Sequence, residues 1–275
     1  MPQAPFWKIQ TIGNHFVLMH GQDLLGMDLA ESAKRVCSHH WSIGSDGLLV
    51  MWPPSSIGEP IELRMFNPDG TEDFCGNGLR CAAVHGAEQG WASGIFTIRQ
   101  KSIPCQVEAL ADSQAASWLP PASFEPEEIP FVGEKSWLWS EVQGVRGVAV
   151  TTGSTHFVVP VAGLPGDPEF TNLSERIERD TSFPERTSVM WTEAKGGNRI
   201  KLRIWERGVG ETFGCGTGSS AAALVTAVLT GDWGEYQVDN PGGTLLVTVT
   251  GLEDEIKSQS LVTTPFSGTV LLAAD

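Results

Sequence analysis

The stretch that decides the fold is residues 61–67, IELRMFN, because its pattern returns at residues 200–206 as IKLRIWE, at an offset of 200 − 61 = 139. Apolar and polar residues alternate in both copies, which is typical of a β-strand with one buried face. After each strand come a glycine turn and a Cys-Gly-x-Gly run, at residues 75–78 and 215–218. The alanine-rich segments that follow are small or apolar on all sides, which predicts a helix enclosed by protein.

A third match supports the same spacing, because residues 13–18 (GNHFVL) resemble residues 153–158 (GSTHFV). Self-similarity at a fixed offset is typical of a duplicated structural unit. The sequence therefore predicts two related domains, each with strands around one central helix. We place the first at residues 1–122, with a C-terminal strand at 262–275 returning to it, and the second at 123–261. Pro120 and Pro121 lie near the junction.

Composition excludes several classes of protein. The net charge of -15 over 275 residues disfavours binding to nucleic acid or to an anionic membrane surface, because phosphate contacts rely on clustered Lys and Arg. No apolar run is long enough to span a bilayer, and the first residues lack the basic and apolar regions of a signal peptide. We expect a cytoplasmic protein that acts on a small molecule.

The five cysteines are odd in number and contain no CxxC pair, so they indicate neither a disulfide framework nor a zinc site. The repeat singles out Cys75 and Cys215, each placed where a helix begins. Helix N-termini present unpaired backbone N–H groups and a positive dipole, which stabilise a thiolate and lower its pKa. Cys37, Cys81 and Cys105 lack this matched context, and we expect structural roles for them.

Two thiols on opposite faces of one ligand suggest a specific reaction. A thiolate on one face removes the α-proton of an amino acid, and a thiol on the other face donates one, which inverts the stereocentre. The two helix N-termini would stabilise the charge that develops on the substrate carboxylate. A non-catalytic thiol-disulfide switch between the same cysteines stays open as an alternative.

The two signatures resemble those of the diaminopimelate epimerase family, through residues 64–72 (RMFNPDGTE) with 75–81 (CGNGLRC), and residues 206–212 (ERGVGET) with 215–218 (CGTG). Weaker matches extend the resemblance over nearly the whole chain: residues 13–14, 43–46, 183–186 and 241–243. The resemblance implies an α+β fold of two pseudo-symmetric domains, each a strand barrel wrapped around a central helix. It also implies a homodimer, an active site between the domains, and no pyridoxal phosphate, metal or other cofactor.

On this resemblance, Cys75 and Cys215 are the catalytic acid/base pair. The carboxylate at the reacting centre would be held by Gly76, Asn77, Gly216, Thr217 and Gly218. The remaining polar groups of the substrate would be bound by Asn14, Asn67, Glu206 and Arg207, with Ser154 and Ser188 lining the same part of the pocket. The implied reaction interconverts LL- and meso-diaminopimelate.

Four positions depart from the family pattern. Ser154 and Ser188 stand where asparagine is usual, Gly47 where glutamine is usual, and His15 where aspartate is usual. Polar contacts of this kind give sharp specificity, so a different amino acid, such as histidine or proline, is an alternative substrate. A phenazine-biosynthesis-like isomerase of the same architecture is disfavoured, since it would not require paired thiols.

The remaining motifs give little evidence of function. His20, His85 and the His39-His40 pair have no further cluster at ligand spacing, so we expect no metal site. The glycine-rich runs lack the Lys-Ser/Thr ending of a nucleotide-binding P-loop.

Overall fold

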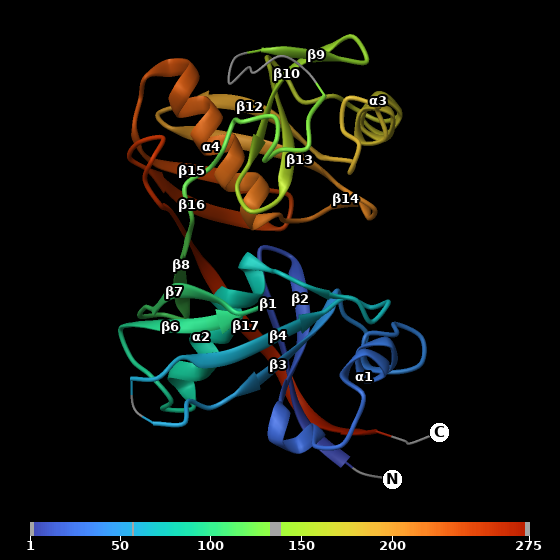
Figure 1. Ribbon diagram of the computed structural model, residues 1–275, viewed down its shortest axis with the longest axis vertical. Helices are drawn as coiled ribbons and strands as arrows, with labels where there is room; N and C mark the ends of the chain where they lie inside the picture. Colours follow the sequence, from blue (N-terminus) through green and yellow to red (C-terminus); the bar gives the residue numbers. More distant parts are fainter. Residues whose placement is uncertain (1–2, 57, 133–138, 273–275) are drawn as a thin grey trace. The chain divides into compact units, whose positions relative to one another are not determined.

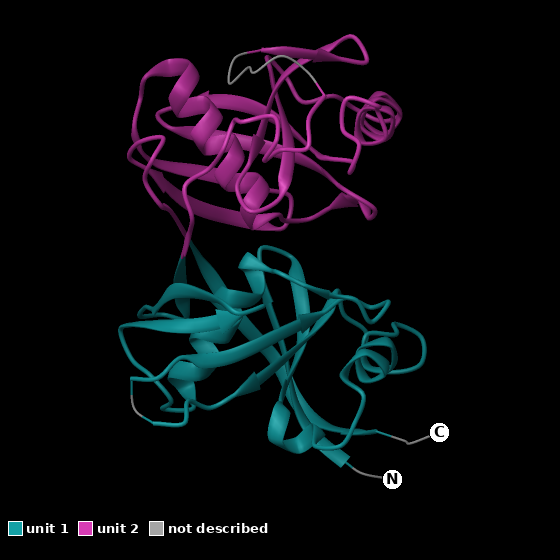
Figure 2. Ribbon diagram, viewed as in Figure 1, with its two compact units in different colours: residues 1–117, 259–275 teal, residues 118–258 magenta. Residues whose placement is uncertain are grey.

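The computed structural model describes residues 3–56, 58–132 and 139–272. The chain divides into two compact units, one of residues 1–117 with 259–275 and one of residues 118–258 (Figure 2). Strand β17 (Ile256–Leu271) begins in the second unit and ends in the first, and the last three residues of the predicted C-terminal strand lie outside the described residues. None of the described helices is both long and apolar enough to cross a membrane.

The first unit is a closed ring of strands around one helix. Its ring runs β1–β2–β3–β4–β6–β7–β8–β17 and back to β1. The elements, labelled in Figure 1, are β1 (Gln3–Thr11), β2 (Asn14–His20), η1 (Gly21–Leu24), α1 (Leu29–Val36), β3 (Gly47–Trp52), β4 (Ile61–Phe66), β5 (Glu72–Asp73), α2 (Gly76–Glu88), β6 (Ile95–Gln100), β7 (Ile103–Ala109) and β8 (Gln114–Leu119).

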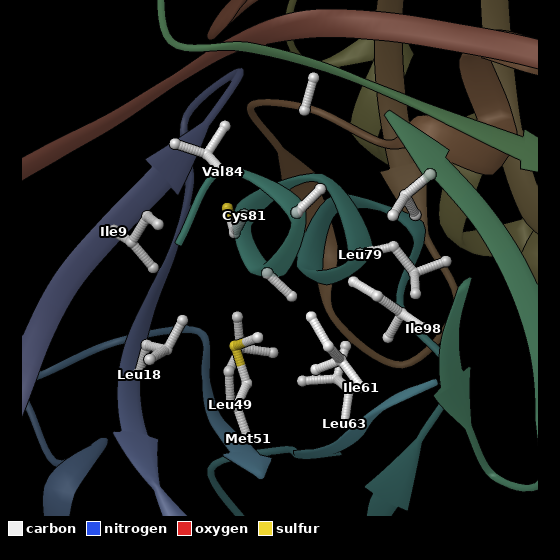
Figure 3. Close-up of a cluster of buried hydrophobic side chains, with 14 of the residues drawn as sticks. Ile9, Leu18, Leu49, Met51, Ile61, Leu63, Leu79, Cys81, Val84 and Ile98 are labelled. Carbon is white, nitrogen blue, oxygen red and sulfur yellow. The ribbon is translucent and has the colours of Figure 1, made fainter. Parts of the chain in front are cut away.

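Helix α2 is the core of this ring, because all of its residues from position 76 to 86 are buried. Figure 3 shows Leu79, Cys81 and Val84 of the helix among strand side chains such as Leu49 and Ile61. Small residues on every side let the helix fit inside the ring. Each large apolar side chain buried in this way contributes about 1.5–3 kcal/mol.

Strand β3 shows how the layers are built. Leu49 and Met51 face α2, whereas Leu48 and Val50 pack on the other side with α1. The strand pairs in parallel with β2, and strands buried on both faces read as continuous apolar runs. This burial on two sides explains why residues 48–51 lack the alternation seen in β4.

The second unit repeats this plan. Its elements are β9 (Ser140–Val142), β10 (Val145–Thr151), β11 (Thr155–Val161), α3 (Glu169–Glu178), β12 (Ser188–Gly196), β13 (Arg199–Glu206), β14 (Gly210–Thr212), α4 (Gly216–Thr230), β15 (Gly234–Asn240) and β16 (Gly243–Val249). Strand β17 lies next to β16 in the sheet, and it also pairs with β8. An isolated bridge between Ser123 and Thr151 connects the segment that follows β8 to β10.

Strand pairing confirms the predicted repeat. From β1 to β7 the successive pairs are antiparallel, parallel, antiparallel, parallel and antiparallel. The pairs from β10 to β16 follow the same series. Helices α2 and α4 each follow a short strand that pairs with the strand of the repeated motif. The prediction of two pseudo-symmetric units, each a strand barrel around a central helix, is confirmed.

Candidate active site

Cys75 is the N-cap of α2. Its backbone is extended (φ -142°, ψ 108°), and its sulfur accepts the Gly78 N–H at 3.4 Å. The first N–H groups of a helix have no partner within the helix, so a side chain or a ligand must satisfy them. Cys75 is partly exposed, and it lies at a helix N-terminus, as predicted.

Cys215 caps α4 in the same way. Its backbone is also extended (φ -126°, ψ 114°), and its sulfur accepts the Gly218 N–H at 3.4 Å. The Thr217 hydroxyl lies 3.5 Å from the same sulfur. Unlike Cys75, this residue is only 6% exposed. The two caps share a geometry but differ in their access to solvent.

A side-chain amide supports each cysteine backbone, and the sequence motifs did not reveal either amide. The Cys75 N–H donates to Gln100 Oε1 at 3.3 Å, and the Cys215 N–H donates to Asn240 Oδ1 at 3.4 Å. Both amides are buried, and each is the last residue of a strand, β6 or β15. Their offset, 240 − 100 = 140, equals that of the cysteines, and this shared spacing is the feature of the sequence that could have identified them.

A chain of hydrogen bonds organises the surroundings of Cys75. Asn77 donates to Asn14 Oδ1 at 3.1 Å, and Asn14 donates to Asp46 Oδ2 at 2.8 Å. Arg80, which is 1% exposed, donates to the side-chain Oδ1 of Asn77 and, at 2.8 Å, to Ser260 Oγ. The structure thus brings Asn14 and Asn77 together, beside Gly76 in the first turn of α2. Arg80 and Asp46 were not predicted as site residues, although they lie in stretches that resemble the family, residues 75–81 and 43–46.

Asn67 lies in the turn between β4 and β5. Its amide donates to the Thr71 hydroxyl at 3.0 Å, and its backbone N–H donates to the Thr71 carbonyl at 2.8 Å. Gly70 has a positive φ of 87° there, which a residue with a side chain adopts only with strain. In the structure, Asn67 closes this turn through its two hydrogen bonds with Thr71.

The two altered positions of the first unit have structural consequences. A Cβ at Gly47 would lie 2.9 Å from Met65 Cε and 3.0 Å from the Phe66 carbonyl oxygen, so this backbone leaves no room for a side chain. His15 lies 2.8 Å from Lys8 Nζ, and its backbone N–H donates to Asp46 at 2.9 Å. Burial lowers the pKa of His15. A polar cluster of Lys8, His15 and Asp46 therefore adjoins Asn14.

Glu206 is the last residue of β13, and Arg207 and Gly208 follow it in the turn toward β14. Glu206 accepts the Thr212 hydroxyl at 2.6 Å. The Arg207 N–H donates to Ser188 Oγ at 3.1 Å, and its guanidinium donates to the Glu185 carbonyl at 3.1 Å. The structure therefore brings Arg207 and Ser188 together.

The turn between β10 and β11 lies beside the start of α4. Thr152 donates through its hydroxyl to the Thr217 carbonyl at 2.8 Å, and its N–H donates to the Ser154 carbonyl at 3.3 Å. Ser154 is partly exposed at this turn. Thr152 thus links the predicted residues Ser154 and Thr217, a role that no motif revealed.

The electrostatics of Cys215 correct one expectation. Burial, and secondly the Glu206 carboxylate, raise the pKa of the Cys215 thiol well above its ordinary value, while the Thr217 hydroxyl and the Gly218 N–H lower it. The helix N-terminus does lower the pKa through the Gly218 N–H, but burial outweighs it, so the prediction of a lowered thiol pKa is wrong for Cys215. Desolvation disfavours the charged form, and a nearby negative charge adds to that effect. Cys215 holds its proton at neutral pH.

The other cysteines differ from this pair. None of the five, all within the described residues, is in a disulfide. Burial raises the pKa of Cys37 and Cys81, and it raises that of Cys105 to about 11. Among residues 3–56, 58–132 and 139–272, no group of three or more His, Cys, Asp or Glu side chains is placed to hold a metal ion.

The effect of Glu206 on Cys215 is testable. In Glu206→Gln the pKa of the Cys215 thiol should fall, because a neutral amide replaces the carboxylate that disfavours the thiolate. A fall of one unit raises the thiolate fraction at pH 7.5 about tenfold, and the alkylation rate with it. Iodoacetamide labelling of the Cys215 peptide, followed by mass spectrometry from pH 6 to 10, measures the shift. Glu235→Gln, an exposed change on β15, is the control, and equal profiles for both variants would contradict the assignment.

Comparison with known proteins shows the family. A family model for diaminopimelate epimerase matches residues 148–262. A protein named diaminopimelate epimerase from Halorhodospira halophila is 33% identical over 98% of this chain and 96% of that protein. One of the same name from Methanothrix thermoacetophila is 35% identical over 91% of each.

Solved structures show the same fold at low identity. A phenazine biosynthesis protein of the PhzF family from Bacillus anthracis has a TM-score of 0.71 at 17% identity, covering 99% of this chain and 100% of that one. A hydroxyproline epimerase from Agrobacterium vitis has a TM-score of 0.65 at 14% identity, covering 98% and 91%. The extent of the match to the sequence relatives decides the assignment: the chain belongs to the diaminopimelate epimerase family.

Proposed function

We propose that the protein is an isomerase that interconverts LL- and meso-diaminopimelate, a step of lysine and peptidoglycan precursor synthesis. The observation that carries the proposal is the matched pair of cysteine N-caps, each accepting the N–H of the glycine three residues later. Relatives named diaminopimelate epimerase, similar over nearly the full length, support it.

In the proposed mechanism, Cys75 and Cys215 act on opposite faces of the α-carbon. One cysteine, as thiolate, takes the α-proton, and the C–H electron pair delocalises into the substrate carboxylate. The other cysteine gives its S–H proton to the opposite face of the carbon and becomes the thiolate. The step is balanced in bonds and charge, and the two thiols have exchanged protonation states.

The carboxylate must be held where its charge grows. Backbone N–H groups at a helix start are suited to this, because they are fixed before the reaction and carry the positive end of the dipole. We assign this role to Gly76 and Asn77 on α2, and to Gly216, Thr217 and Gly218 on α4. Gly76, Asn77, Gly216 and Gly218 are buried, which strengthens electrostatic interactions.

The protonation state of Cys215 suggests a direction. Because burial and Glu206 raise the pKa of this thiol, it would enter the reaction as the proton donor. We propose that Cys75 is then the base for the substrate enantiomer whose α-hydrogen faces it. The reverse reaction would start from the exchanged protonation states.

The far end of diaminopimelate carries an amine and a carboxylate, and we assign Glu206 and Arg207 to bind this charged pair. Asn14, Asn67, Ser154 and Ser188 would complete the polar contacts, with water filling the space left by the two short serines. A second candidate, a racemase of another amino acid, is favoured by one observation: Ser188 Oγ already accepts the Arg207 N–H. A hydroxyl committed to the backbone has less to offer a substrate.

We further propose a cytoplasmic homodimer that works without a metal or an organic cofactor. Thiols that must cycle between acid and base require a reducing compartment. The substrate is a small amino acid, and the net charge of -15 argues against partners such as nucleic acid or membranes.

The test is incubation in deuterium oxide with reductant and no added cofactor, using LL-diaminopimelate, meso-diaminopimelate and a panel of single-enantiomer amino acids including histidine and proline. Nuclear magnetic resonance follows deuterium at the α-carbon, and chiral chromatography follows inversion. We expect both with diaminopimelate. Inversion of another amino acid alone would favour the second candidate, and no exchange with any member would contradict an epimerase.

A further inference from the structure

A buried carboxylate outside the proposed site holds the loop that carries Glu206 and Arg207. Glu178 is the last residue of α3 and is 2% exposed. Its Oε1 accepts the Gly208 N–H at 2.7 Å and a guanidinium N–H of Arg186, and its Oε2 accepts the Trp205 indole N–H at 2.8 Å. Three donors from two other segments of the chain thus converge on one side chain.

Stability alone is a weak reason for this arrangement. Removing the Glu178 carboxylate from water is costly, and its partner Arg186 is 42% exposed, so the ion pair repays only part of that cost. Glu178 also lies next to an apolar cluster that contains Phe170, Ile177 and Trp191. The direction of its hydrogen bonds is more informative, because two of the three donors, Trp205 and Gly208, flank Glu206 and Arg207.

The backbone of this loop is fixed at each step. The Arg207 N–H donates to Ser188 Oγ at 3.1 Å, the Gly208 N–H donates to Glu178, and the Val209 N–H donates to the Glu206 carbonyl at 3.1 Å. Gly208 has a positive φ of 79°, which suits glycine and closes the turn tightly. Charge-assisted bonds such as the one at 2.7 Å are the strong members of such a set.

The partner of Glu178 also supports the guanidinium of Arg207. Arg186 follows Glu185, whose carbonyl accepts the Arg207 side chain at 3.1 Å. Arg186 has a positive φ of 64°, an uncommon conformation for a residue with a side chain, and its ion pair with Glu178 holds the chain there. Glu178 therefore acts on Arg207 from two sides, through the Gly208 N–H and through Arg186.

We propose that Glu178 is a positioning residue: it fixes the 206–208 loop so that Glu206 and Arg207 are presented, preorganised, to the polar end of the substrate remote from the reacting carbon. It makes no contact with the substrate itself. The inference rests on the proposed function, in which Arg207 and Glu206 bind that polar end. Fixing such groups in advance reduces the cost of binding and orientation.

The experiment compares Glu178→Gln with the wild type and with Glu175→Gln. Glutamine keeps the volume and one acceptor oxygen but loses the charge that pairs with Arg186 and one of the two acceptors. Glu175 lies on the same helix, and its partner is the exposed Arg179 at 3.2 Å, so it is the matched control. We expect KM for diaminopimelate to rise at least about tenfold in Glu178→Gln with kcat within about threefold, because loss of uniform binding raises KM alone.

A second measurement does not depend on turnover. Hydrogen exchange followed by mass spectrometry should show faster exchange at residues 205–209 in Glu178→Gln, with helix α4 unchanged. Faster exchange throughout the second unit would show a general structural role and overturn the proposal, as would unchanged exchange with unchanged KM. Absence of diaminopimelate turnover in the wild type would instead refute the proposed function, and the exchange measurement would still test the loop.

Discussion

Cys75→Ser and Cys215→Ser should each lose inversion of diaminopimelate by at least about 10³-fold, since a positioned acid or base contributes about 10²–10⁴-fold and serine cannot supply a thiolate at neutral pH. In the proposed mechanism inversion needs both groups, because the proton leaves one face of the carbon and arrives on the other. Chiral chromatography of product formed from a single stereoisomer measures the loss.

Isotope exchange separates the two thiols. In each variant one thiol remains, and it can remove an α-proton from the face it serves and return a solvent deuteron to that same face. We therefore expect exchange without inversion, and with opposite stereoisomers in the two variants. Exchange of the same stereoisomer in both variants would contradict the assignment of opposed faces.

The matched control is Cys81→Ala. Cys81 lies on α2 six residues beyond Cys75, but it is fully buried in the core of the first unit, and we expect activity within about threefold of the wild type. Full inversion activity in either serine variant, or an equal loss in Cys81→Ala at unchanged thermal stability, would refute the two-thiol mechanism.

The repeat made much of this predictable from the sequence. Residues 61–67 and 200–206 alternate; β4 takes up residues 61–66 of the first stretch, and β13 consists of the second stretch together with Arg199, which precedes it. A cysteine before a Gly-x-Gly run is a good position for a helix start, and Cys75 and Cys215 are both N-caps. These features are local, so one stretch of chain contains the information that determines them.

The supporting residues depend on strand register, which is not local. Gln100 and Asn240 are 25 residues after their cysteines, and only the parallel pairing of β6 with β4 and of β15 with β13 brings them back. Glu178 is one acidic residue among 33, and nothing nearby in the sequence marks it as buried. The raised pKa of Cys215 likewise depends on burial, which reverses the effect of the helix N-terminus.

The second large effect is expected when a side chain is added to the glycine whose N–H donates to the cysteine sulfur. In Gly218→Ala the new Cβ would lie 2.4 Å from Met190 Sδ, 2.8 Å from Met190 Cε and 3.2 Å from Cys215 Sγ. The Met190 side chain must move, and the thiol must shift from its place over the Gly218 N–H. Because a displacement of about 1 Å can cost about 10²-fold and the sulfur must give by a few tenths of an ångström, we expect kcat to fall by about tenfold. Steady-state kinetics with diaminopimelate measures it.

The same change at the other helix should be milder. A Cβ at Gly78 would lie 2.9 Å from Leu49 Cδ2 but 3.7 Å from Cys75 Sγ, an ordinary contact. Gly78→Ala should therefore lower thermal stability through Leu49 while kcat falls less than in Gly218→Ala. Equal losses of kcat in the two variants would show that the contact with the sulfur is not the cause.

A double variant that removes the clash with Met190 distinguishes the effect of core packing from the effect of moving the Cys215 thiol. In Gly218→Ala with Met190→Ala, the new methyl group gains the space of the methionine side chain, so part of the lost thermal stability should return relative to Met190→Ala alone. The 3.2 Å contact with the Cys215 sulfur remains, so kcat should stay low. Recovery of kcat together with stability would mean that the glycine serves only packing, whereas stability without activity would show that position 218 must lack a side chain for the thiol to occupy its place at the start of α4.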